Sequence, residues 1–529
     1  MSTSTNDSAP DCGAHWSSPA AASIRRAGSW TVGELLAAQA RRVPERIALD
    51  DGVNTLTYHA LNQRANRLAS CLASLGVVRG MRVAILSENR NEYIEAAYAA
   101  AKLGAILCAL NWRLTPAELG HCVDLVEPVV VLLSPRFEAA YEKIARAGTA
   151  RIVYGTAYET QLTACSPCEP PVVAEPEDGL LILYTSGTTG MPKGALISHR
   201  AELARMELSR IDVGLEEGDS FVAWAPMFHM VSLEHALHVL GLGGKVFVVD
   251  GADIPRLTQL VEKERQWWLV LIPGMIEPLV QALREKNVPP KGLKVIGVLA
   301  DLVPAQLVGE ASRLMNAPYW NSFGSTETGM LPAAGTRFAI GEVPENLAKA
   351  HNGLYLWRLV DSEDQDVTPG QAGEIAVRGP TLFSGYWNRD DVNEHEFRGG
   401  WFHMGDMFIE GPDGRLSFVD RSKYLIKSGG ENIYPIEIER VLMNDPRVAE
   451  AVVVRRKDSR WGEVPVAFVA VHDTTVSEEE LLRVCRDGLS SYKLPRQIRF
   501  VASQDDFPRS TSGKVQRQRV EQWLEDAGP

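Results

Sequence analysis

Segments with the patterns of strands and helices alternate through the first 180 residues of the chain. Apolar residues recur at helical spacing in 38–43 and 58–75, and a further helix is expected over 91–103. Apolar runs typical of buried strands lie at 81–86 and 104–110. Because strand–helix alternation favours a parallel sheet covered by helices, we predict an α/β protein.

The texture of the sequence changes twice further along the chain. Strands are expected at 245–249, 268–272 and 294–299, with helices between them. From about residue 353, shorter β-like runs are separated by Gly and Pro turns. After residue 420, helical and strand-like patterns alternate again, which indicates a separate C-terminal unit.

These changes predict the domain organisation. At roughly 100–200 residues per domain, a chain of 529 residues corresponds to three or four structural units. We predict a flexible tail, a large N-terminal domain of helix-covered β-sheets with a β-rich subdomain inside it, a hinge, and a small mobile α+β C-terminal domain. The tail is predicted over 1–25 and the large domain over 26–420, with its subdomain at about 353–420. The hinge is predicted over 421–424 and the small domain over 425–529.

The net charge limits the classes of partner. A formal charge of −13 argues against broad binding to a nucleic-acid backbone, for which a basic face is the usual footprint. The charge is uneven, because residues 421–529 carry 18 Lys and Arg against 17 Asp and Glu. This near-neutral unit either closes over an anionic ligand or reflects ordinary variation of surface charge.

Neither a membrane-spanning helix nor a secretory signal is expected. No window of about 18 residues is uninterruptedly apolar, and residues 1–18 are polar. The seven cysteines are scattered, and only Cys165 and Cys168 have the spacing of metal ligands. A structural zinc site needs four ligands, and no second pair is spaced to complete it. We therefore expect a cytoplasmic protein with reduced thiols.

Hydroxyls, glycines and a lysine are concentrated in residues 181–194. An apolar strand runs there into a loop with five hydroxyl-bearing residues, three glycines and Lys193. Such a loop suits phosphate groups, because glycines let backbone amides approach the oxygens and lysine adds positive charge. It is not a GxxxxGK[ST] loop, since Pro192 stands where that pattern needs glycine. A strand at 195–198 and a helix after Arg200 are expected to follow; the alternative is a flexible hairpin loop.

Residues 184–194, Tyr-Thr-Ser-Gly-Thr-Thr-Gly-Met-Pro-Lys-Gly, resemble the phosphate loop of the adenylate-forming superfamily, which includes acyl- and aryl-CoA synthetases, adenylation domains and luciferases. Four later segments resemble further motifs of that family, in the same order. They are 321–329 for adenine and magnesium, 400–406 for ribose, 420–435 for the hinge and thiol tunnel, and 508–514 for the catalytic lysine. The texture is nearest to fatty-acid and crotonobetaine/carnitine-type CoA ligases.

This resemblance implies an AMP-forming acid–CoA ligase of fatty-acid or lipid metabolism. Such an enzyme transfers AMP from ATP to a carboxylate, because oxide is a poor leaving group and a phosphate is a good one, and then passes the acyl group to CoA. The implied cofactors are ATP, Mg2+ and CoA. The implied partners are small molecules and no nucleic acid, and a homodimer is left open.

Two alternatives also remain open. The first is a stand-alone adenylating enzyme that loads a carrier-protein thiol. The second is a nucleotide-binding relative without catalysis. The joint presence of five polar residues that the family uses speaks against the second alternative; they are Lys193, Glu327, Asp406, Arg421 and Lys514.

The resemblance also implies an ATP site with defined roles. Glu327 and Thr185 would hold Mg2+, Asp406 and Arg421 would bind ribose, and Phe323, where the family usually has tyrosine, would stack on adenine. Lys193, Lys514, Glu327 and His229 are the implied catalytic residues. The implied ATP-binding residues are Thr185, Ser186, Gly187, Thr188, Thr189, Gly190, Lys193, Asn321, Ser322, Phe323, Gly324, Thr326, Asp406, Arg421 and Lys514.

The second half-reaction implies that the small domain turns about Lys423. Gly429 and Gly430 would then line a channel for the pantetheine arm, where a β-carbon would narrow the passage. Three further residues fall where related ligases contact CoA, although a packed surface is an equal reading; they are Trp461, Tyr492 and Arg496.

An apolar acid is predicted as the substrate. His229 would border its carboxylate, although a histidine among apolar residues is also often a core residue. Asp301 is unusual for the family, and it would pair with the adenine amino group or with a cationic or hydroxylated acid, or lie on the surface. Residues 337–352 also depart from the family pattern. The implied acyl pocket is His229, Met230, Val231, Ala300 and Asp301.

Overall fold

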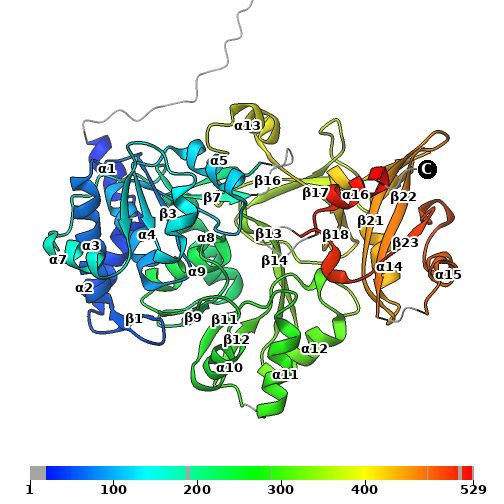
Figure 1. Ribbon diagram of the computed structural model, residues 1–529, viewed down its shortest axis with the longest axis horizontal. Coiled ribbons are helices and arrows are strands. Elements are labelled where there is room, and N and C mark those ends of the chain that lie inside the picture. The colour runs from blue at the N-terminus through cyan, green and yellow to red at the C-terminus, as the bar shows by residue number, and fades with distance from the viewer. Residues whose placement is uncertain are drawn as a thin grey trace, which may run out of the picture.

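The computed structural model describes residues 20–185, 191–287, 289–429, 431–472, 475–509 and 515–526. In this part of the chain, helices cover four β-sheets, and the predicted α/β class is confirmed (Figure 1). No helix in it is both long enough and apolar enough to cross a bilayer. The elements coloured orange and red, from residue 426 on, lie together at one end of the molecule.

The first sheet has the strand order β6-β5-β3-β4-β7-β8, and its strands are parallel except for the pair β7 and β8. The strands are β3 Arg82–Leu86, β4 Ile106–Ala109, β5 Val130–Leu133, β6 Ala150–Val153, β7 Gly179–Thr185 and β8 Lys193–Ser198. The helices between them are α4 Asn91–Leu103, α5 Pro116–Val126, α6 Glu138–Glu142 and α7 Thr156–Ala164.

The second sheet has the order β14-β13-β12-β11-β9-β10-β1-β2, with antiparallel strands at both ends. Its strands are β1 Ile47–Asp50, β2 Thr55–Thr57, β9 Ser220–Ala223, β10 Lys245–Val248, β11 Gln266–Leu269, β12 Leu293–Ile296, β13 Tyr319–Ser325 and β14 Gly329–Phe338. The helices of this region are α1 Ala21–Ala27, α2 Val32–Arg42, α3 Tyr58–Ser74, α8 His199–Val213, α9 Met230–Gly241, α10 Ile254–Lys263, α11 Ile276–Lys286 and α12 Ala305–Met315.

Two smaller antiparallel sheets follow. The β-rich part is built of β15 Leu356–Val360, β16 Ala372–Arg378, β17 Phe402–Glu410 and β18 Leu416–Arg421, with the helix α13 Asp390–Glu396. The last sheet contains β19 Ile426–Ser428, β20 Glu431–Ile433, β21 Val448–Asp458, β22 Gly462–Val471 and β23 Ile498–Val501. Its helices are α14 Pro435–Met443, α15 Glu478–Gly488 and α16 Arg517–Asp526.

The central strands are buried on both faces, which explains their uninterrupted apolar sequences. Alternate residues of a strand point to opposite faces of the sheet. In β3, Val83 and Ile85 join the main core, whereas Ala84 and Leu86 join a second cluster under α5 and α6. A parallel strand between two helical layers therefore has no polar face.

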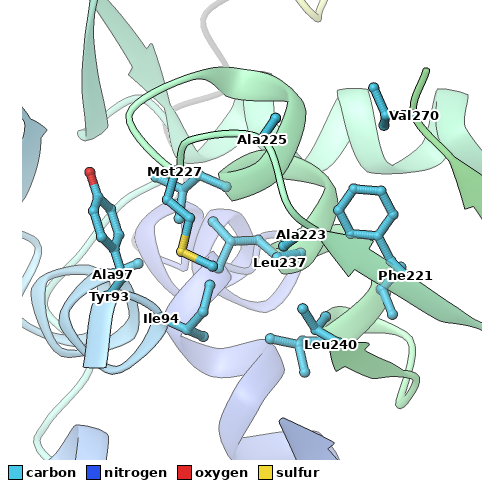
Figure 2. Close-up of a cluster of buried hydrophobic side chains, with 14 of the residues drawn as sticks. Tyr93, Ile94, Ala97, Phe221, Ala223, Ala225, Met227, Leu237, Leu240 and Val270 are labelled. Carbon is cyan, nitrogen blue, oxygen red and sulfur yellow. The ribbon is translucent and has the colours of Figure 1, made fainter. Parts of the chain in front are cut away.

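The two large sheets are joined through a helical layer. Helix α4 packs on the first sheet, α9 packs on the second, and the two helices contact each other. Figure 2 shows buried side chains from both sides of this layer meeting in one cluster, among them Tyr93, Ile94, Ala97, Phe221, Leu237 and Leu240. Burial of apolar surface at this junction holds the two sheets together.

Most predicted elements lie within a few residues of the observed ones. Helix α4 has the predicted bounds, Asn91–Leu103, because Gly104 adopts a left-handed conformation (φ +63°) and ends it. The predicted strand 268–272 instead occupies 266–269. Burial continues past Leu269, and an apolar run does not mark where strand pairing stops.

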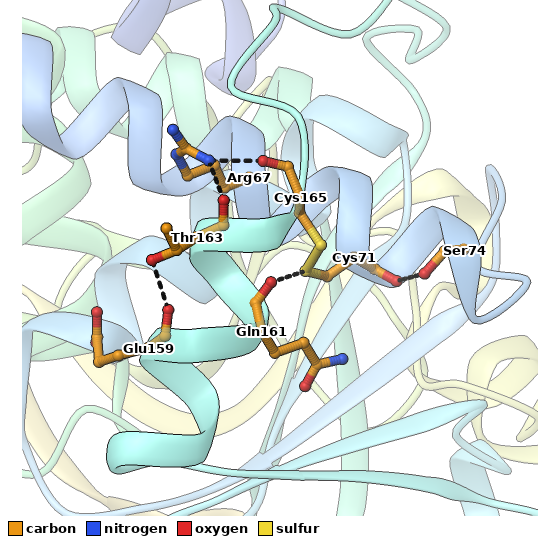
Figure 3. Close-up of a disulfide and its surroundings, with 7 residues drawn as sticks. All are labelled: Arg67, Cys71, Ser74, Glu159, Gln161, Thr163 and Cys165. Atoms are coloured by element: carbon orange, nitrogen blue, oxygen red, sulfur yellow. Dashed lines mark hydrogen bonds between the residues drawn. A yellow bond between two sulfur atoms is a disulfide. The ribbon is translucent and has the colours of Figure 1, made fainter.

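Cys71 of α3 and Cys165, directly after α7, form a disulfide between positions 94 residues apart (Figure 3). The expectation of reduced thiols is therefore wrong for this pair. Sequence spacing draws attention to Cys165 and Cys168, whereas the packing of α3 against α7 supplies the true partner. Arg67 reinforces the junction by donating to the carbonyl oxygen of Cys165 at 2.7 Å, and Cys168 stays a free, exposed thiol.

We expect the Cys71→Ser variant to be less stable than the wild type by about 2–4 kcal/mol in denaturant unfolding without reductant. The cross-link closes a long loop, so its loss gives the unfolded chain more conformations. Cys168→Ser is the matched control and should leave the unfolding midpoint unchanged. Equal stability of all three proteins would contradict this prediction, as would a non-reduced peptide map without the Cys71–Cys165 link.

Candidate active site

Strands β7 and β8 form an antiparallel hairpin, and two residues predicted to bind phosphate lie where β7 ends and β8 begins. Thr185 ends β7 and pairs directly with Lys193, which begins β8. The two predicted strands on either side of the loop are confirmed. Within the described residues, the buried Thr185 hydroxyl makes no hydrogen bond. Five residues assigned to the loop lie outside the described residues: Ser186, Gly187, Thr188, Thr189 and Gly190.

The helix after the hairpin begins slightly earlier than predicted. Helix α8 starts at His199, whereas the sequence suggested a start after Arg200. The reason is a cap at Ser198, whose hydroxyl accepts a hydrogen bond from the Ala201 amide at 3.2 Å. The helix is therefore anchored to the end of β8.

Lys193 is buried beneath an aromatic ring that the sequence did not single out. Its Nζ lies 3.7 Å from the centroid of the Tyr386 ring, and the side chain is almost enclosed. Burial lowers the pKa of Lys193, while the charges of Glu396 and Glu327 oppose that shift. The Tyr386 hydroxyl donates to Glu327 Oε1 at 2.8 Å. Tyr386 thus bridges the hairpin lysine and the motif glutamate.

The segment around Tyr386 is held by backbone hydrogen bonds on two sides. The Trp387 amide donates to the Gly194 carbonyl at 2.8 Å, and the Phe383 amide donates to the Glu327 carbonyl at 2.9 Å. A bridge between Ala195 and Tyr386 adds this segment to the edge of β8. No motif or periodicity marks Tyr386 in the sequence, so only the fold identifies it.

The turn that carries Glu327 rests on a buried arginine. Arg205 of α8 donates to the carbonyl oxygens of Thr326 and Thr381, each at 3.0 Å. Its third contact is the Glu234 carboxylate of α9 at 2.7 Å. Because Arg205 is buried, these three acceptors satisfy a charge that would otherwise be costly to enclose. No pattern in the sequence marks Arg205 either.

Behind Arg205, a carboxyl group and a histidine share a buried contact. Glu202 Oε1 lies 3.2 Å from His238 Nε2, and His238 Nδ1 lies 3.0 Å from the Ser209 hydroxyl. Burial raises the pKa of Glu202 to about 7 and lowers the pKa of His238 to about 3. A protonated Glu202 beside a neutral His238 leaves no charge buried at this contact.

The predicted ribose pair lies on two neighbouring strands. Asp406 of β17 is opposite Arg421 of β18, and Arg421 Nε lies 3.0 Å from Asp406 Oδ1. The charge of Asp406, and after it that of Glu327, raises the pKa of Arg421. The carboxylates of the ribose motif and of the magnesium motif therefore both interact electrostatically with Arg421.

The adenine motif forms β13 and the turn that follows. The Phe323 ring packs against Phe408 and Phe418, with centroids 4.9 and 5.2 Å away. A β-carbon on Gly324 would lie 2.1 Å from the Gly329 carbonyl oxygen, so only glycine fits there. The remaining predicted members, Asn321, Ser322 and Thr326, lie on the same segment.

On the predicted acyl side, Asn89 fastens the segment that leads to His229. The Asn89 side-chain oxygen accepts from the Met227 backbone amide at 2.8 Å, and the Asn89 side-chain amide donates to the Ala225 carbonyl at 2.8 Å. The rings of Phe228 and His229 lie 4.5 Å apart, directly before Met230 and Val231 open α9. Aromatic and apolar side chains dominate this part of the site.

Asp301 is buried, so the reading as a surface carboxylate is wrong. Its side chain is 3% exposed and forms ion pairs with the buried Lys349 and with Arg440 of α14. Ala300, its neighbour, donates its amide to the Asn321 side-chain oxygen at 3.3 Å. Lys349 belongs to the segment that departs from the family pattern, and the fold brings these two departures into contact.

Three of the residues predicted to bind CoA lie together. The Gly429 amide donates to the Trp461 carbonyl at 2.8 Å, and a β-carbon on Gly429 would come within 2.6 Å of the indole. The Arg496 guanidinium lies 5.8 Å from the centre of the same ring. Trp461 and Tyr492 are both partly exposed. Gly430 and Lys514 lie outside the described residues.

The predicted hinge residue, Lys423, lies in a short 3-10 turn, Ser422–Tyr424, directly after β18. Burial lowers its pKa, and the nearby positive charge of Arg421 acts in the same direction. Its carbonyl oxygen accepts a hydrogen bond from Arg455 of β21 at 3.3 Å. The turn thus connects the two parts of the chain in sequence and through this bond.

The protonation of Glu202 yields a test at two pH values. A carboxyl group with a raised pKa contributes its stability below the unfolded pKa and loses it as the pH rises through the folded value, here between about 4.5 and about 7. Glu202→Gln keeps the size and shape of the side chain beside His238 and does not titrate. We expect it to exceed the wild type by about 1–3 kcal/mol in urea unfolding at pH 8 and to match it at pH 4.5. A pH-independent difference would contradict the assignment.

Comparisons with known proteins agree with this geometry. The family described as AMP-binding enzyme matches residues 36–387, and the family described as AMP-binding enzyme C-terminal domain matches residues 437–514. Indoleacetate–CoA ligase from Aromatoleum aromaticum (strain DSM 19018 / LMG 30748 / EbN1) is 34% identical over 496 residues, which cover 90% of this chain and 95% of that protein.

Solved structures give the same result. o-Succinylbenzoate CoA synthetase from Bacillus subtilis, in complex with its acyl-adenylate intermediate, has a TM-score of 0.81 at 29% identity and covers 92% of this chain and 97% of its own. The same enzyme with ATP and magnesium has a TM-score of 0.80 at 29% identity, with 92% and 99% covered. The motifs in their order, the hairpin at the phosphate loop and these similarities lead to one conclusion: the chain belongs to the AMP-binding enzyme family of the adenylate-forming superfamily, as an ATP-dependent acid–CoA ligase that acts through an acyl-adenylate.

Proposed function

We propose that the chain converts an apolar, ring-containing carboxylic acid into its CoA thioester. The observation that carries the proposal is the array of Lys193, Tyr386 and Glu327, to which the ribose pair is electrostatically coupled through Arg421. Attack on the α-phosphate of a nucleotide requires groups that stabilise the phosphate charge and groups that hold the sugar. The array supplies a buried lysine and a motif carboxylate for the first task, and the ribose pair for the second.

The first step joins two anions. A carboxylate oxygen of the acid attacks the α-phosphorus of ATP, the bond to the β-phosphate oxygen breaks, and pyrophosphate leaves. Lys193 would stabilise the departing pyrophosphate, because its enclosed charge acts in a medium of low dielectric constant. Asp406 and Arg421 would hold the ribose, and Phe323 would offer its ring to adenine. Lys514 is assigned from its motif to the carboxylate and the α-phosphate.

The residues at the hairpin also fit a magnesium ion. Mg2+ prefers hard oxygen ligands. Glu327 supplies a carboxylate, one oxygen of which accepts from Tyr386, and the buried Thr185 hydroxyl has no partner among the described residues. When bound, the ion would neutralise charge on the phosphates. The Tyr386 bond would fix the orientation of the Glu327 carboxylate before ATP arrives.

The second step transfers the acyl group to sulfur. The CoA thiol loses its proton and attacks the acyl carbon, the bond to phosphate breaks, and AMP leaves. Gly429, Trp461 and Arg496 would line the approach of the pantetheine arm. For this step we propose that residues 425–529 act as one domain that turns about the hinge 421–424, relative to a large domain that ends at 420.

The acid is proposed from the lining of the site and from the relatives. Phe228, His229 and Met230 border the acyl side, and Trp112 packs edge-on against Phe228 with centroids 5.8 Å apart. Aromatic walls favour flat, apolar rings. Relatives include ligases named for indoleacetate and 2-succinylbenzoate. A mycobacterial fatty acyl-CoA synthetase also resembles the chain, at 26% identity, so fatty acids are the second candidate class.

A pyrophosphate-release assay with ATP, Mg2+ and CoA tests this function across arylacetic, benzoic, fatty, alicyclic and betaine acids. We expect arylacetic and benzoic acids to give the highest kcat/KM.

Lys514→Ala should abolish adenylate formation and largely spare thioester formation from supplied acyl-adenylate. Equal loss of both steps would contradict the assigned role of Lys514, and a product seen only with a carrier protein would favour the carrier-loading alternative.

Tyr386→Phe removes the hydroxyl that donates to Glu327 and keeps the ring over Lys193. We expect adenylate formation to fall about tenfold and the Mg2+ concentration for half-maximal rate to rise, because a hydrogen bond to a charged group is worth about 1.5–3 kcal/mol. Tyr184→Phe in the same hairpin is the control, since its hydroxyl donates to the Cys122 carbonyl, away from Glu327. A decrease of equal size in both variants would show a general packing effect.

A further inference from the structure

One ion pair connects the body of the molecule to the C-terminal unit. Arg440 of α14 reaches Asp301 in the 3-10 turn Ala300–Leu302, with Nη2 and Oδ1 3.5 Å apart. Within the described part of the chain, this is the one ion pair between residues up to 420 and residues from 425 on. Its carboxylate is buried, whereas the Arg440 side chain is 40% exposed.

Asp301 has a second cationic partner that belongs to the body itself. The Lys349 side chain is fully buried and donates to Asp301 Oδ2 and to the Leu347 carbonyl. The carboxylate is therefore compensated whether or not Arg440 is in place. Arg440 uses the other oxygen, so its contact can form and break without leaving a buried charge alone.

The Asp301–Lys349 pair is also tied to the adenine motif. The Leu347 carbonyl that accepts from Lys349 at 3.1 Å also accepts from the Asn321 side-chain amide at 3.0 Å. The Asn321 oxygen in turn accepts from the Ala300 amide, next to Asp301. A docking point for the small domain thus shares hydrogen bonds with the strand proposed to hold the nucleotide.

We propose that Arg440 is a positioning residue whose contact with Asp301 favours the domain arrangement of this structure, and so sets the balance between adenylate formation and thioester formation. The inference rests on the proposed function, in which the small domain takes two positions. A rotation about Lys423 moves α14 as a whole, so an ion pair at 3.5 Å in one position is separated in the other. The contact therefore stabilises one position only.

A distance measurement tests the contact without turnover. Fluorophores on Gln306→Cys of α12 and Asp487→Cys of α15, both exposed positions, report the domain arrangement in a background that carries Cys12→Ser and Cys168→Ser. We expect Arg440→Gln to shift the population towards a second distance. Arg447→Gln is the matched control, because Arg447 is similarly exposed and its 2.7 Å partner, Asp445, lies in the same domain. It should leave the distance distribution unchanged.

The same variants are then compared in the two half-reactions. We expect Arg440→Gln to change the ratio of acid-dependent pyrophosphate exchange to thioester formation from supplied acyl-adenylate by threefold or more, and Arg447→Gln to preserve it. Arg440→Lys should restore part of the wild-type ratio, since it keeps the charge. Asp301→Asn is less informative, because it leaves Lys349 buried without its carboxylate.

An unchanged distance distribution together with an unchanged ratio in Arg440→Gln would overturn the proposal. A shifted distribution with an unchanged ratio would also overturn it, since the contact would then not control the reaction. Absence of both half-reactions in the wild type would instead refute the proposed function. The distance measurement still reports on the contact in that case, so the two failures are distinguishable.

Discussion

The buried charge of Lys193 is the constraint around which the site is built. A lysine enclosed in protein is stable only where other groups compensate its lost hydration. Here the face of Tyr386 covers the ammonium group, and the carboxylate of Glu327 accepts a hydrogen bond from the hydroxyl group of the same ring. This compensation requires the segment 383–387 to run along β8. The backbone bonds to Gly194 and Glu327 hold it there, so the phosphate hairpin and the magnesium motif are parts of one unit.

Buried polar groups form a second layer behind Lys193 and Glu327. Arg205 fixes the turn before Glu327 through backbone carbonyls, and its own charge is paired with Glu234. Farther back, burial lowers the pKa of His238 to about 3, so this histidine is neutral near pH 7, and raises the pKa of Glu202 to about 7, so its carboxyl group is partly protonated there. Because His238 is neutral, this network holds the turn before Glu327 at a smaller desolvation cost than four fully ionised groups would require.

Local patterns predict much of this protein, and contacts between distant segments account for the rest. The α4 helix, the hairpin of β7 and β8, and the ribose pair all follow from periodicity or from motifs. Tyr386 lies 193 positions after Lys193, in a loop without a regular pattern, and Arg205 resembles any helical arginine until its carbonyl partners are known. Cys71 and Cys165 pair for the same reason, because only tertiary packing joins α3 to α7. Asp301 is recognisably unusual in the sequence, but its partner Lys349 is not.

The contrast between apolar and polar contacts would allow the small domain to move, as proposed above, without losing its fold. The two faces of the last sheet have their own cores, built from residues 426 onward, and no residue of these clusters belongs to the main core of the body. The free energy gained by burying apolar surface between the domains would grow with the contact area and would hold the domains in one arrangement. A partly exposed ion pair contributes far less stabilising free energy, and this contribution depends on the geometry of the two side chains. The balanced charge of residues 421–529 fits the same proposal, because a moving unit would face an acidic body and anionic ligands in turn, and strong attraction to either would hold it in one position.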